Sequence, residues 1–446
     1  MDHLHHQLQF KPNSSWSSDV LHIQGGYSLH GEVLLGGSKN AALPIIVAAI
    51  LGIKEIILQN VPTIQDIKNI LNIIETLGVE VNWQTLQHQV TLKTDQMRAT
   101  PLTHPLMQSM RASFLLAAPM LARFGHVTLL FPGGDAIGIR PVNYHLQGFQ
   151  QLGAIVDVQQ SHITMTAKNG LKGAIIHLPF PSVGATQNLM MAACCARGET
   201  VIRQAAQEPE IVDLANFLNS MGGHIQGAGS DTLYIRGSAG ELLPYAASYR
   251  IIPDRIELIT LAAAAAMTGG KIFIPDVSAS ILGAGTLNAL GQLGVVLHNV
   301  SQGIYVQSGP VNQRDRYFST APFPGLATDA QPIIMALACL VEGETRITET
   351  IFENRFQHVR ALQAMGADIS VEKAMAFIRG KSSLSGASLH ATDIRAAAAL
   401  LIAALAASGT SRLCPMHHIY RGYDGLIAKL TNMGACFAHV PFQAKS

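Results

Sequence analysis

The stretch TDIRAAAALLIAALAAS, at residues 392–408, is apolar on nearly every side of a helix. Such a helix has no face to turn toward water, so the rest of the protein must enclose it. It nevertheless begins with two charged residues, Asp393 and Arg395. The first N–H groups of a helix lack partners and carry partial positive charge, so they attract anions. A buried helix that starts in this way predicts a charged binding site at its N-terminal end.

The same arrangement occurs in six places along the chain. The other apolar stretches begin near Lys39, Arg111, Ser182, Arg255 and Asp329. Four of the six therefore open on Lys or Arg, at helix ends that already favour negative ligands. Together they predict a site for a heavily anionic substrate.

A second pattern has the same period. A Leu-Gly or Met-Gly pair ends a helix and precedes a strand about every 70 residues, a spacing typical of internal structural repeats. The helix before the first pair, at residues 63–77, is amphipathic, with Ile67, Leu71 and Ile74 on one face. Gly78 is its predicted C-terminal cap. The six pairs are Leu77-Gly78, Leu152-Gly153, Met221-Gly222, Leu293-Gly294, Met365-Gly366 and Met433-Gly434.

One such repeat cannot bury its apolar helix alone, but three repeats around a shared axis can, with helices inside and sheets outside. Six repeats then predict an α/β protein of two similar domains, which suits a chain of 446 residues. The fourth repeat starts around Pro253-Asp254-Arg255, a natural boundary. The first strand, at residues 20–35, precedes the first apolar helix and is free to belong to the other half.

The composition excludes several classes of protein. Hydrophobic residues make up 48% of the chain and charged residues 13%, which fits large buried helices. A net charge of +1 argues against a general nucleic-acid or membrane-surface binder. The longest apolar runs, at residues 43–53, 258–268 and 396–407, are shorter than the roughly 20 residues of a membrane span. Residues 1–20 are polar and Ser-rich, and we expect a disordered extension there.

The cysteines argue against a disulfide framework and a zinc site. Their number is odd, no Cys-x-x-Cys motif is present, and three lie in apolar helices. We therefore expect a reducing, cytoplasmic location, with no metal and no cofactor. The five are Cys194, Cys195, Cys339, Cys414 and Cys436.

Ten segments keep the order of the motifs of one known family. They are GGSKNAALP (36–44), MRASFLLAAPMLARFG (110–125), PGGDAIGIRPVNYH (132–145), SVGAT (182–186), EPEIVDLANFL (208–218), PDRIE (253–257), ATDAQ (327–331), TETIFENRFQHV (348–359), ATDIRAAAALL (391–401) and HHIYRGYDGL (417–426). Together they closely resemble the UDP-N-acetylglucosamine 1-carboxyvinyltransferases, the enolpyruvyl transferases of peptidoglycan synthesis. The likeness covers almost all of the chain from residue 21 onward.

The resemblance implies a two-domain inside-out α/β barrel of six repeats, in agreement with the periodicity. It also implies that the N-terminal strand returns to the C-terminal domain. The domains would then be residues 39–252, and residues 21–38 plus 253–446. The family closes its domains around substrates under a flexible lid near residues 130–140. Pro132-Gly133-Gly134 suits such a loop, since glycines permit unusual backbone angles.

The implied reaction transfers the enolpyruvyl group of phosphoenolpyruvate to the 3-hydroxyl of UDP-N-acetylglucosamine and releases phosphate. It is the first committed step of peptidoglycan synthesis, and hence serves the cell wall, cell shape and cell division. Two alternatives stay open. The same chemistry acts on shikimate 3-phosphate in a related synthase, although PGGDAIGIRP, SVGAT and FENRF resemble the sugar-nucleotide enzymes more. A non-catalytic regulatory paralogue would need neither a base nor a phosphoenolpyruvate clamp. The resemblance names no protein partner.

The resemblance implies that phosphoenolpyruvate is held mainly by cations. Arginine suits this task because its planar fork bonds bidentately to phosphate and carboxylate, whereas a lysine acts as a point charge. Lys39 and Arg395 are also expected to take part in catalysis. The implied set is Lys39, Asn40, Arg140, Arg355, Arg395 and Arg421.

For the sugar nucleotide, the resemblance implies residues from several segments. Ser182-Val183-Gly184 opens a helix, so its N–H groups could receive the diphosphate, and Ser182 could also cap the helix. Asp329 is the expected base for the sugar 3-hydroxyl, at a position where an N-cap is also common. The implied set is Asn40, Arg111, Arg140, Pro141, Val142, Asn143, Tyr144, Phe180, Pro181, Ser182, Val183, Asp329 and Ile351.

Some charged residues near these motifs are expected to have supporting roles. We expect Asp254 and Asp393 to cap helices and to orient the arginine that follows each of them in sequence. His417 and His418 are expected to support the loop of Arg421 rather than to act in catalysis.

The chain departs from many family members at the catalytic acid. Asp135, in PGGDAIG, stands where they have Cys in PGGC. A carboxyl group can donate the proton to the methylene carbon if burial raises its pKa, whereas nearby Arg140 would lower the pKa. A carboxylate is a poor partner for the epoxide fosfomycin, which alkylates the family cysteine. We therefore expect an active enzyme that resists fosfomycin.

Overall fold

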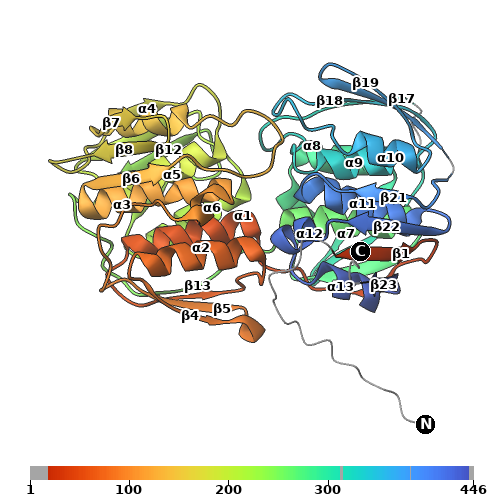
Figure 1. The fold of residues 1–446 in the computed structure, drawn as a ribbon, viewed down its shortest axis with the longest axis horizontal. Coiled ribbons are helices and arrows are strands. Elements are labelled where there is room, and N and C mark those ends of the chain that lie inside the picture. The colour runs from red at the N-terminus through yellow and green to blue at the C-terminus, as the bar shows by residue number, and fades with distance from the viewer. Residues whose placement is uncertain (1–18, 312–314, 382, 441–446) are drawn as a thin grey trace, which may run out of the picture.

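The computed structural model describes residues 19–311, 315–381 and 383–440. Their buried apolar side chains form two separate cores. One lies within residues 41–251, and the other combines residues 21–33 with residues 256–435. We call the parts packed around these cores the N-terminal lobe and the C-terminal lobe, left and right in Figure 1. The cores support domain boundaries at Lys39 and Pro253, which remain a prediction.

The extension expected over residues 1–20 lies outside the described residues, apart from its last two. Val20 is already the first residue of strand β1 (Val20–Gln24). The single strand expected at residues 20–35 is in fact two, β1 and β2 (His30–Glu32), which belong to different sheets.

The N-terminal lobe has three open sheets around its helices (Figure 1). In strand order, they are β13 (Ala247–Arg250), β3 (Ile56–Gln59), β5 (Gln89–Lys93) and β4 (Glu80–Gln84); β6 (His126–Leu130), β8 (His162–Thr166) and β7 (Ile155–Val158); and β11 (His224–Gln226), β12 (Thr232–Arg236), β10 (Glu199–Arg203) and β9 (Ile175–His177). The helices are α1 (Lys39–Ala48), α2 (Gln65–Thr76), α3 (Ala117–Phe124), α4 (Asn143–Gln151), α5 (Val183–Cys194) and α6 (Pro209–Ser220).

The C-terminal lobe repeats this plan with three more sheets. They are β15 (Val295–Val300), β16 (Gly303–Ser308), β14 (Lys271–Pro275) and β2 (His30–Glu32); β17 (Asp315–Ser319), β18 (Gly343–Thr348), β20 (Met375–Gly380) and β19 (Asp368–Glu372); and β21 (Ser388–His390), β22 (Thr410–Cys414), β1 (Val20–Gln24) and β23 (Cys436–Val440). The helices are α7 (Arg255–Met267), α8 (Ala284–Gln292), α9 (Gln331–Ala338), α10 (Val359–Ala364), α11 (Ile394–Ala406), α12 (His417–Gly422) and α13 (Leu426–Asn432).

One sheet for each repeat, with helices inside, confirms the α/β architecture expected from the periodicity. Helix α11 is buried from Ile394 to Leu405, as an apolar helix without a polar face must be. All six glycines of the Leu-Gly and Met-Gly pairs have positive φ, between 79° and 107°, which lets each helix end sharply before a strand. Within the described residues no sheet closes on itself, so three open sheets together enclose each core.

Two chain segments cross between the lobes side by side. Gly37 pairs with Pro253 in an antiparallel bridge. The Ser38 N–H donates to the Ile252 carbonyl at 2.8 Å, and the Asp254 N–H donates to the Gly36 carbonyl at 2.9 Å. Helices α1 and α7 start directly after these crossings, so their N-terminal ends lie at the boundary between the lobes.

Candidate active site

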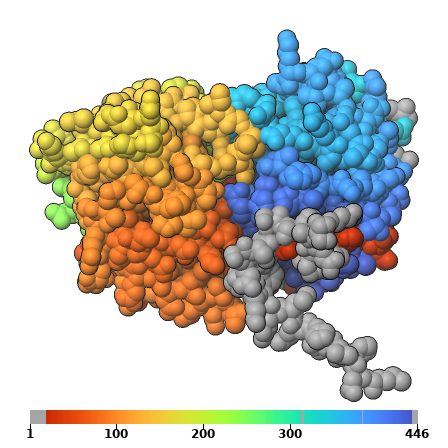
Figure 2. Space-filling model, in the orientation of Figure 1, coloured from red at the N-terminus to blue at the C-terminus, as the bar shows by residue number. Residues whose placement is uncertain are grey.

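A cavity of ≈ 160 Å³ lies where the two lobes meet. Figure 2 shows the lobes in contact along this boundary in the upper part of the view. Nine residues expected at the site line the cavity, five from the N-terminal lobe and four from the C-terminal lobe. They are Lys39, Asn40, Arg111, Asp135 and Arg140, and Asp329, Arg355, Arg395 and Arg421.

Asp329 is held by two arginines of its own lobe. Its two carboxylate oxygens accept from Arg355 Nη2 and from Arg395 Nη2, each at 3.0 Å. Burial would raise the pKa of Asp329, but the two guanidinium groups more than offset this and hold the pKa well below its usual value. Asp329 therefore stays ionised. It does not cap α9, whose N-cap is Ala330.

Asp66 joins the cations of the two lobes. It lies in the first turn of α2 and is 2% exposed. Lys39 Nζ donates to its carboxylate at 3.2 Å, and Arg421 donates through Nε at 3.0 Å. These contacts align a lysine of one lobe with an arginine of the other. Sequence reasoning missed this residue, because an acidic residue in a first helical turn is common and gives no signal of its own.

The loop of residues 130–140, which we call the lid, is bound to the C-terminal lobe. The Ile139 N–H donates to the Glu353 carboxylate at 3.1 Å, and Gln357 Nε2 donates to the Ala136 carbonyl at 2.7 Å. Gly138 has a φ of +151°, and a Cβ at this position would overlap the Glu353 carboxylate. This close approach requires a glycine.

Asp135 points from the lid to Arg421, whose Nη1 donates to its carboxylate at 2.7 Å. Burial would raise the pKa of Asp135, but Arg421, followed by Lys39 and His418, lowers it below its usual value. Arg140, the cation expected to act on this carboxylate, instead donates to the Asp135 backbone carbonyl at 3.0 Å. With the lid bound to the C-terminal lobe, the Asp135 side chain is thus ionised and has no proton to donate.

Arg111 and Arg140 lie on the N-terminal side of the cavity, close to one another. Burial lowers the pKa of Arg111 to about 10, and the charge of Arg140 contributes to this shift. Burial also lowers the pKa of Arg140, which packs over the Phe352 ring at 6.0 Å. Burial thus disfavours the charged form of both arginines in the absence of an anionic partner.

The other residues expected to bind the sugar nucleotide do not line this cavity. Asn143 and Tyr144 begin α4, and Ser182 caps α5 by accepting from the Ala185 N–H at 3.4 Å. The two helix starts are close together, because the ring of His145 lies against Gly184. They form a second group beside the lid. The residues outside the cavity are Pro141, Val142, Asn143, Tyr144, Phe180, Pro181, Ser182, Val183 and Ile351.

The capping roles expected of two aspartates are confirmed, but the expected orienting of the next arginine is not seen among the described contacts, since the Arg255 and Arg395 side chains pair with Glu210 and Asp329. Asp254 accepts from the Ile256 and Glu257 N–H groups at the start of α7, and Asp393 accepts from those of Arg395 and Ala396 at the start of α11. The start of α7, by contrast, does not contribute its arginine to the site expected for an anionic substrate. Arg255 does not line the cavity, because it pairs at 2.9 Å with Glu210 of the other lobe.

His417 and His418 precede Arg421 within α12, and their ring centroids lie 4.0 Å apart with the ring planes tilted by 39°. Burial lowers the pKa of His418 to about 4, with His417 contributing, so this imidazole is neutral at ordinary pH. This arrangement favours the expected supporting role beside Arg421.

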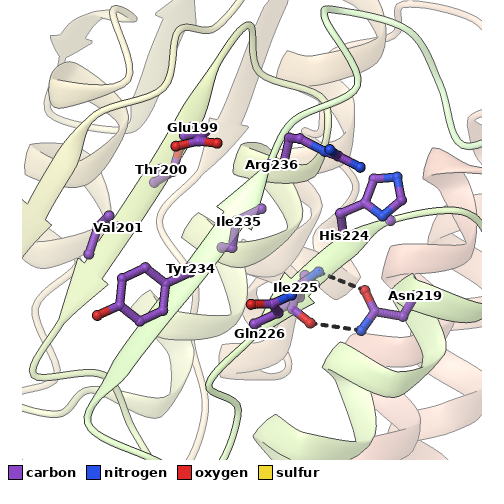
Figure 3. Close-up of a pocket in the computed structure, with 11 residues that line it drawn as sticks. Glu199, Thr200, Val201, Asn219, His224, Ile225, Gln226, Tyr234, Ile235 and Arg236 are labelled. Carbon is purple, nitrogen blue, oxygen red and sulfur yellow. Dashed lines mark hydrogen bonds between the residues drawn. The ribbon is translucent and has the colours of Figure 1, made fainter.

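A larger pocket lies elsewhere, on the outer surface of the β11–β12–β10 sheet (Figure 3). Glu199, Tyr234 and Arg236 line it, and Asn219 bonds both backbone groups of Ile225 beneath it. None of the residues expected at the site belongs to this pocket. Among the described residues, no cluster of His, Cys, Asp or Glu could hold a metal ion. None of the described helices is long and apolar enough to cross a membrane.

Known proteins share this architecture. A model of the EPSP synthase (3-phosphoshikimate 1-carboxyvinyltransferase) family matches residues 23–430. The enolpyruvyl transferase NikO from Streptomyces tendae has a TM-score of 0.85 and 25% identity, over 95% of this chain and 99% of that one. The EPSP synthase of Acinetobacter baumannii has the same fold, with a TM-score of 0.73 and 18% identity over 95% and 100% of the two chains. The two lobes and the cationic site between them thus define an enolpyruvyl transferase.

Two further relatives narrow this class. The UDP-N-acetylglucosamine 1-carboxyvinyltransferase of Trichlorobacter lovleyi is 44% identical, and UDP-N-acetylglucosamine 1-carboxyvinyltransferase 1 of Staphylococcus epidermidis is 45% identical. Each match covers 94% of this chain and 98% of the relative. The chain belongs to the UDP-N-acetylglucosamine 1-carboxyvinyltransferase family.

Proposed function

We propose that this chain transfers the enolpyruvyl group of phosphoenolpyruvate to the 3-hydroxyl of UDP-N-acetylglucosamine and releases phosphate. The observation that carries the proposal is the meeting of Lys39, Arg395 and Arg421 with Asp135 and Asp329 in one cavity between the lobes. This arrangement supplies the cations that hold a phosphate and a carboxylate, together with two carboxyl groups for proton transfer.

The cations divide into two groups. Lys39 and Arg421 meet across the lobe boundary through Asp66, while Arg355 and Arg395 meet on Asp329. We assign both groups, with Asn40 and Arg140, to phosphoenolpyruvate. Arg111 and Arg140 would also balance the diphosphate of the nucleotide, for which the N-terminus of α5 offers free N–H groups. The remaining residues of the second group beside the lid, with Ile351, are assigned to the sugar nucleotide.

The two carboxyl groups have different tasks. Asp329 would accept the proton of the sugar 3-hydroxyl, and Asp135 would donate one to the methylene carbon. Both are ionised in this structure because arginines hold them. Phosphoenolpyruvate brings negative charge to the same arginines, which raises the pKa of each carboxyl group. Asp329 then becomes a stronger base, and Asp135 can carry a proton.

With the lid bound to the C-terminal lobe, the cavity is too small to hold both substrates. At ≈ 160 Å³ it is below the roughly 300–1,000 Å³ of typical small-molecule sites. The lobes must therefore open to admit a sugar nucleotide and close again to keep water from the reactive intermediate.

Phosphate release from phosphoenolpyruvate tests the proposal. The purified chain is offered UDP-N-acetylglucosamine in one assay and shikimate 3-phosphate in another. Release with the sugar nucleotide alone supports the proposal, and release with shikimate 3-phosphate alone refutes it. No release with either acceptor favours a regulatory sugar-nucleotide-binding protein. The five free cysteines also support a cytoplasmic location, which we propose with the function.

A further inference from the structure

Four charged residues at the lobe boundary are joined by successive ion pairs. Lys39 and Arg421 are the cations, and Asp66 and Asp135 are their counter-ions. The four formal charges cancel, so this part of the site is already neutral before any substrate arrives. An anionic ligand that binds to Lys39 or Arg421 here competes with these carboxylates for the same donors.

The two counter-ions differ in how firmly they are held. Asp66 is buried in α2, and both of its oxygens accept from the cations. Asp135 belongs to the lid, and its side chain is 17% exposed. Among the described residues, one hydrogen bond, from Arg421, holds its carboxylate. Asp66 is therefore the fixed counter-ion, and Asp135 is the exchangeable one.

The guanidinium of Arg421 donates hydrogen bonds to two different carboxylates. Its Nε and Nη2 face Asp66, and its Nη1 faces Asp135. A guanidinium has five N–H donors in a rigid fork. Because Nε and Nη2 are held by the buried Asp66, a ligand oxygen must bind at Nη1. That position is filled by an oxygen of Asp135, which has the same charge and acceptor geometry as an oxygen of a carboxylate or phosphate.

Resting on the proposed function for the identity of the substrate, we propose that Asp135 occupies the place of an anionic group of phosphoenolpyruvate on Arg421. The substrate and the enzyme's own lid then compete for this guanidinium. Other titratable groups face the Asp135 carboxylate but make no hydrogen bond to it in the described residues. They are Lys39, Arg140, His417 and His418.

This competition has a consequence opposite to that of an ordinary binding residue. Removing the Asp135 carboxylate should tighten the binding of phosphoenolpyruvate, although it removes the proposed acid and so slows turnover. We expect Asp135→Asn and Asp135→Ala to bind phosphoenolpyruvate about five- to tenfold more tightly, the effect of releasing one partly exposed ion pair. The alanine variant should show at least the effect of the asparagine variant, because asparagine can still accept from Arg421.

Glu353→Gln is the matched control. It also removes one negative charge next to the lid, and its amide oxygen can still accept from the Ile139 N–H. Its carboxylate, however, makes no contact with Arg421 or Lys39 in the described residues. If general charge near the lid were the cause, this variant would gain affinity as well.

The experiment is calorimetric titration of each variant with phosphoenolpyruvate, and separately with inorganic phosphate, without sugar nucleotide. Tighter binding in both Asp135 variants and unchanged binding in Glu353→Gln support the competition. Unchanged or weaker binding in the Asp135 variants, or an equal gain in the control, overturns it. Wild-type phosphate release with UDP-N-acetylglucosamine is measured in parallel. If it occurs while the affinities do not change, the competition is wrong and the proposed function stands. If it fails while inorganic phosphate binding tightens, the proposed function is wrong and the lid still competes with anions.

Discussion

Arg421 of the C-terminal lobe holds Asp66 of the N-terminal lobe side-on, with Nε 3.0 Å from one carboxylate oxygen and Nη2 3.5 Å from the other. We expect Asp66→Asn to lower the free energy of unfolding by about 1–3 kcal/mol, the usual cost of leaving buried partners unpaired. Saturating inorganic phosphate should recover part of this loss in thermal denaturation, because the anion pairs with the freed cations. Glu75→Gln, exposed on the same helix, is the control. An equal loss in both variants would contradict the prediction.

Asp329→Asn separates binding from chemistry. Without the carboxylate, Arg355 and Arg395 lose their shared counter-ion, so phosphoenolpyruvate should bind at least as tightly as to the wild type. Turnover should fall about 10²- to 10⁴-fold, the usual contribution of a general base. Calorimetry gives the affinity, and phosphate release gives the rate. Weak binding combined with normal turnover would rule out the proposed role of Asp329.

Fosfomycin should not inactivate the wild-type protein, because Asp135 offers no thiol in the lid. The thiols of Cys195 and Cys339 are also unreactive, since burial raises the pKa of each to about 12. Asp135→Cys should remain active and become sensitive to time-dependent inactivation. Activity remaining after preincubation measures this. Covalent inactivation of the wild type, or an active but insensitive cysteine variant, would count against the missing thiol as the cause.

His88 of the N-terminal lobe pairs with Asp424 of the C-terminal lobe at 3.3 Å. The hydrogen bond to Asp424 raises the pKa of His88, against the effect of burial, while Lys429 lowers it slightly. A raised folded-state pKa stabilises the protein fully below the unfolded pKa of about 6.5, and this stabilisation is lost as pH rises through the folded pKa. The melting temperature of His88→Gln should therefore fall further below that of the wild type at about pH 5.5 than at about pH 8.5. A difference that is constant with pH would show that the pair does not titrate in this way.

Gly138→Ala should hinder lid closure, because its methyl group would meet the Glu353 carboxylate. We expect kcat/KM to fall about tenfold or more, the effect of misplacing a catalytic group, with little change in melting temperature. Gly170→Ala has the control geometry, since Gly170 also has positive φ but nothing lies near its Cβ position. Kinetics that change equally in both variants would point to backbone strain rather than to the lid contact.

Features that are local in sequence were predictable. The six helix-ending glycines and the caps at Asp254 and Asp393 follow from short patterns, because helix ends use nearby residues to satisfy their backbone groups. The repeat of these patterns predicted the inside-out architecture before any contact was known. The split of the first strand into β1 and β2 was missed, since β2 (His-Gly-Glu) is polar and exposed and so has no apolar pattern of its own, and the partners of both strands lie far along the chain.

The electrostatics of the site could not be predicted, because its partners are distant in sequence. Asp66 lies 27 positions from Lys39 and 355 from Arg421, and Asp135 lies 286 positions from Arg421. The sequence left open whether burial or a cation would decide the pKa of Asp135. Only the folded arrangement shows that Arg421 decides it, because the pKa depends on which cation touches the carboxylate.

The place of β1 sets an order of events during synthesis. This strand leaves the ribosome long before β22 and β23, yet it lies between them, with Ile23 opposite Ser411 on one side and Phe437 on the other. The core of residues 41–251, by contrast, is continuous in sequence and can fold while the rest is still being translated. The N-terminal strand must wait, unpaired, until nearly the whole chain has emerged. A sheet completed late in synthesis thus contains a strand made early, and a chain truncated before β22 leaves β1 without its two neighbours.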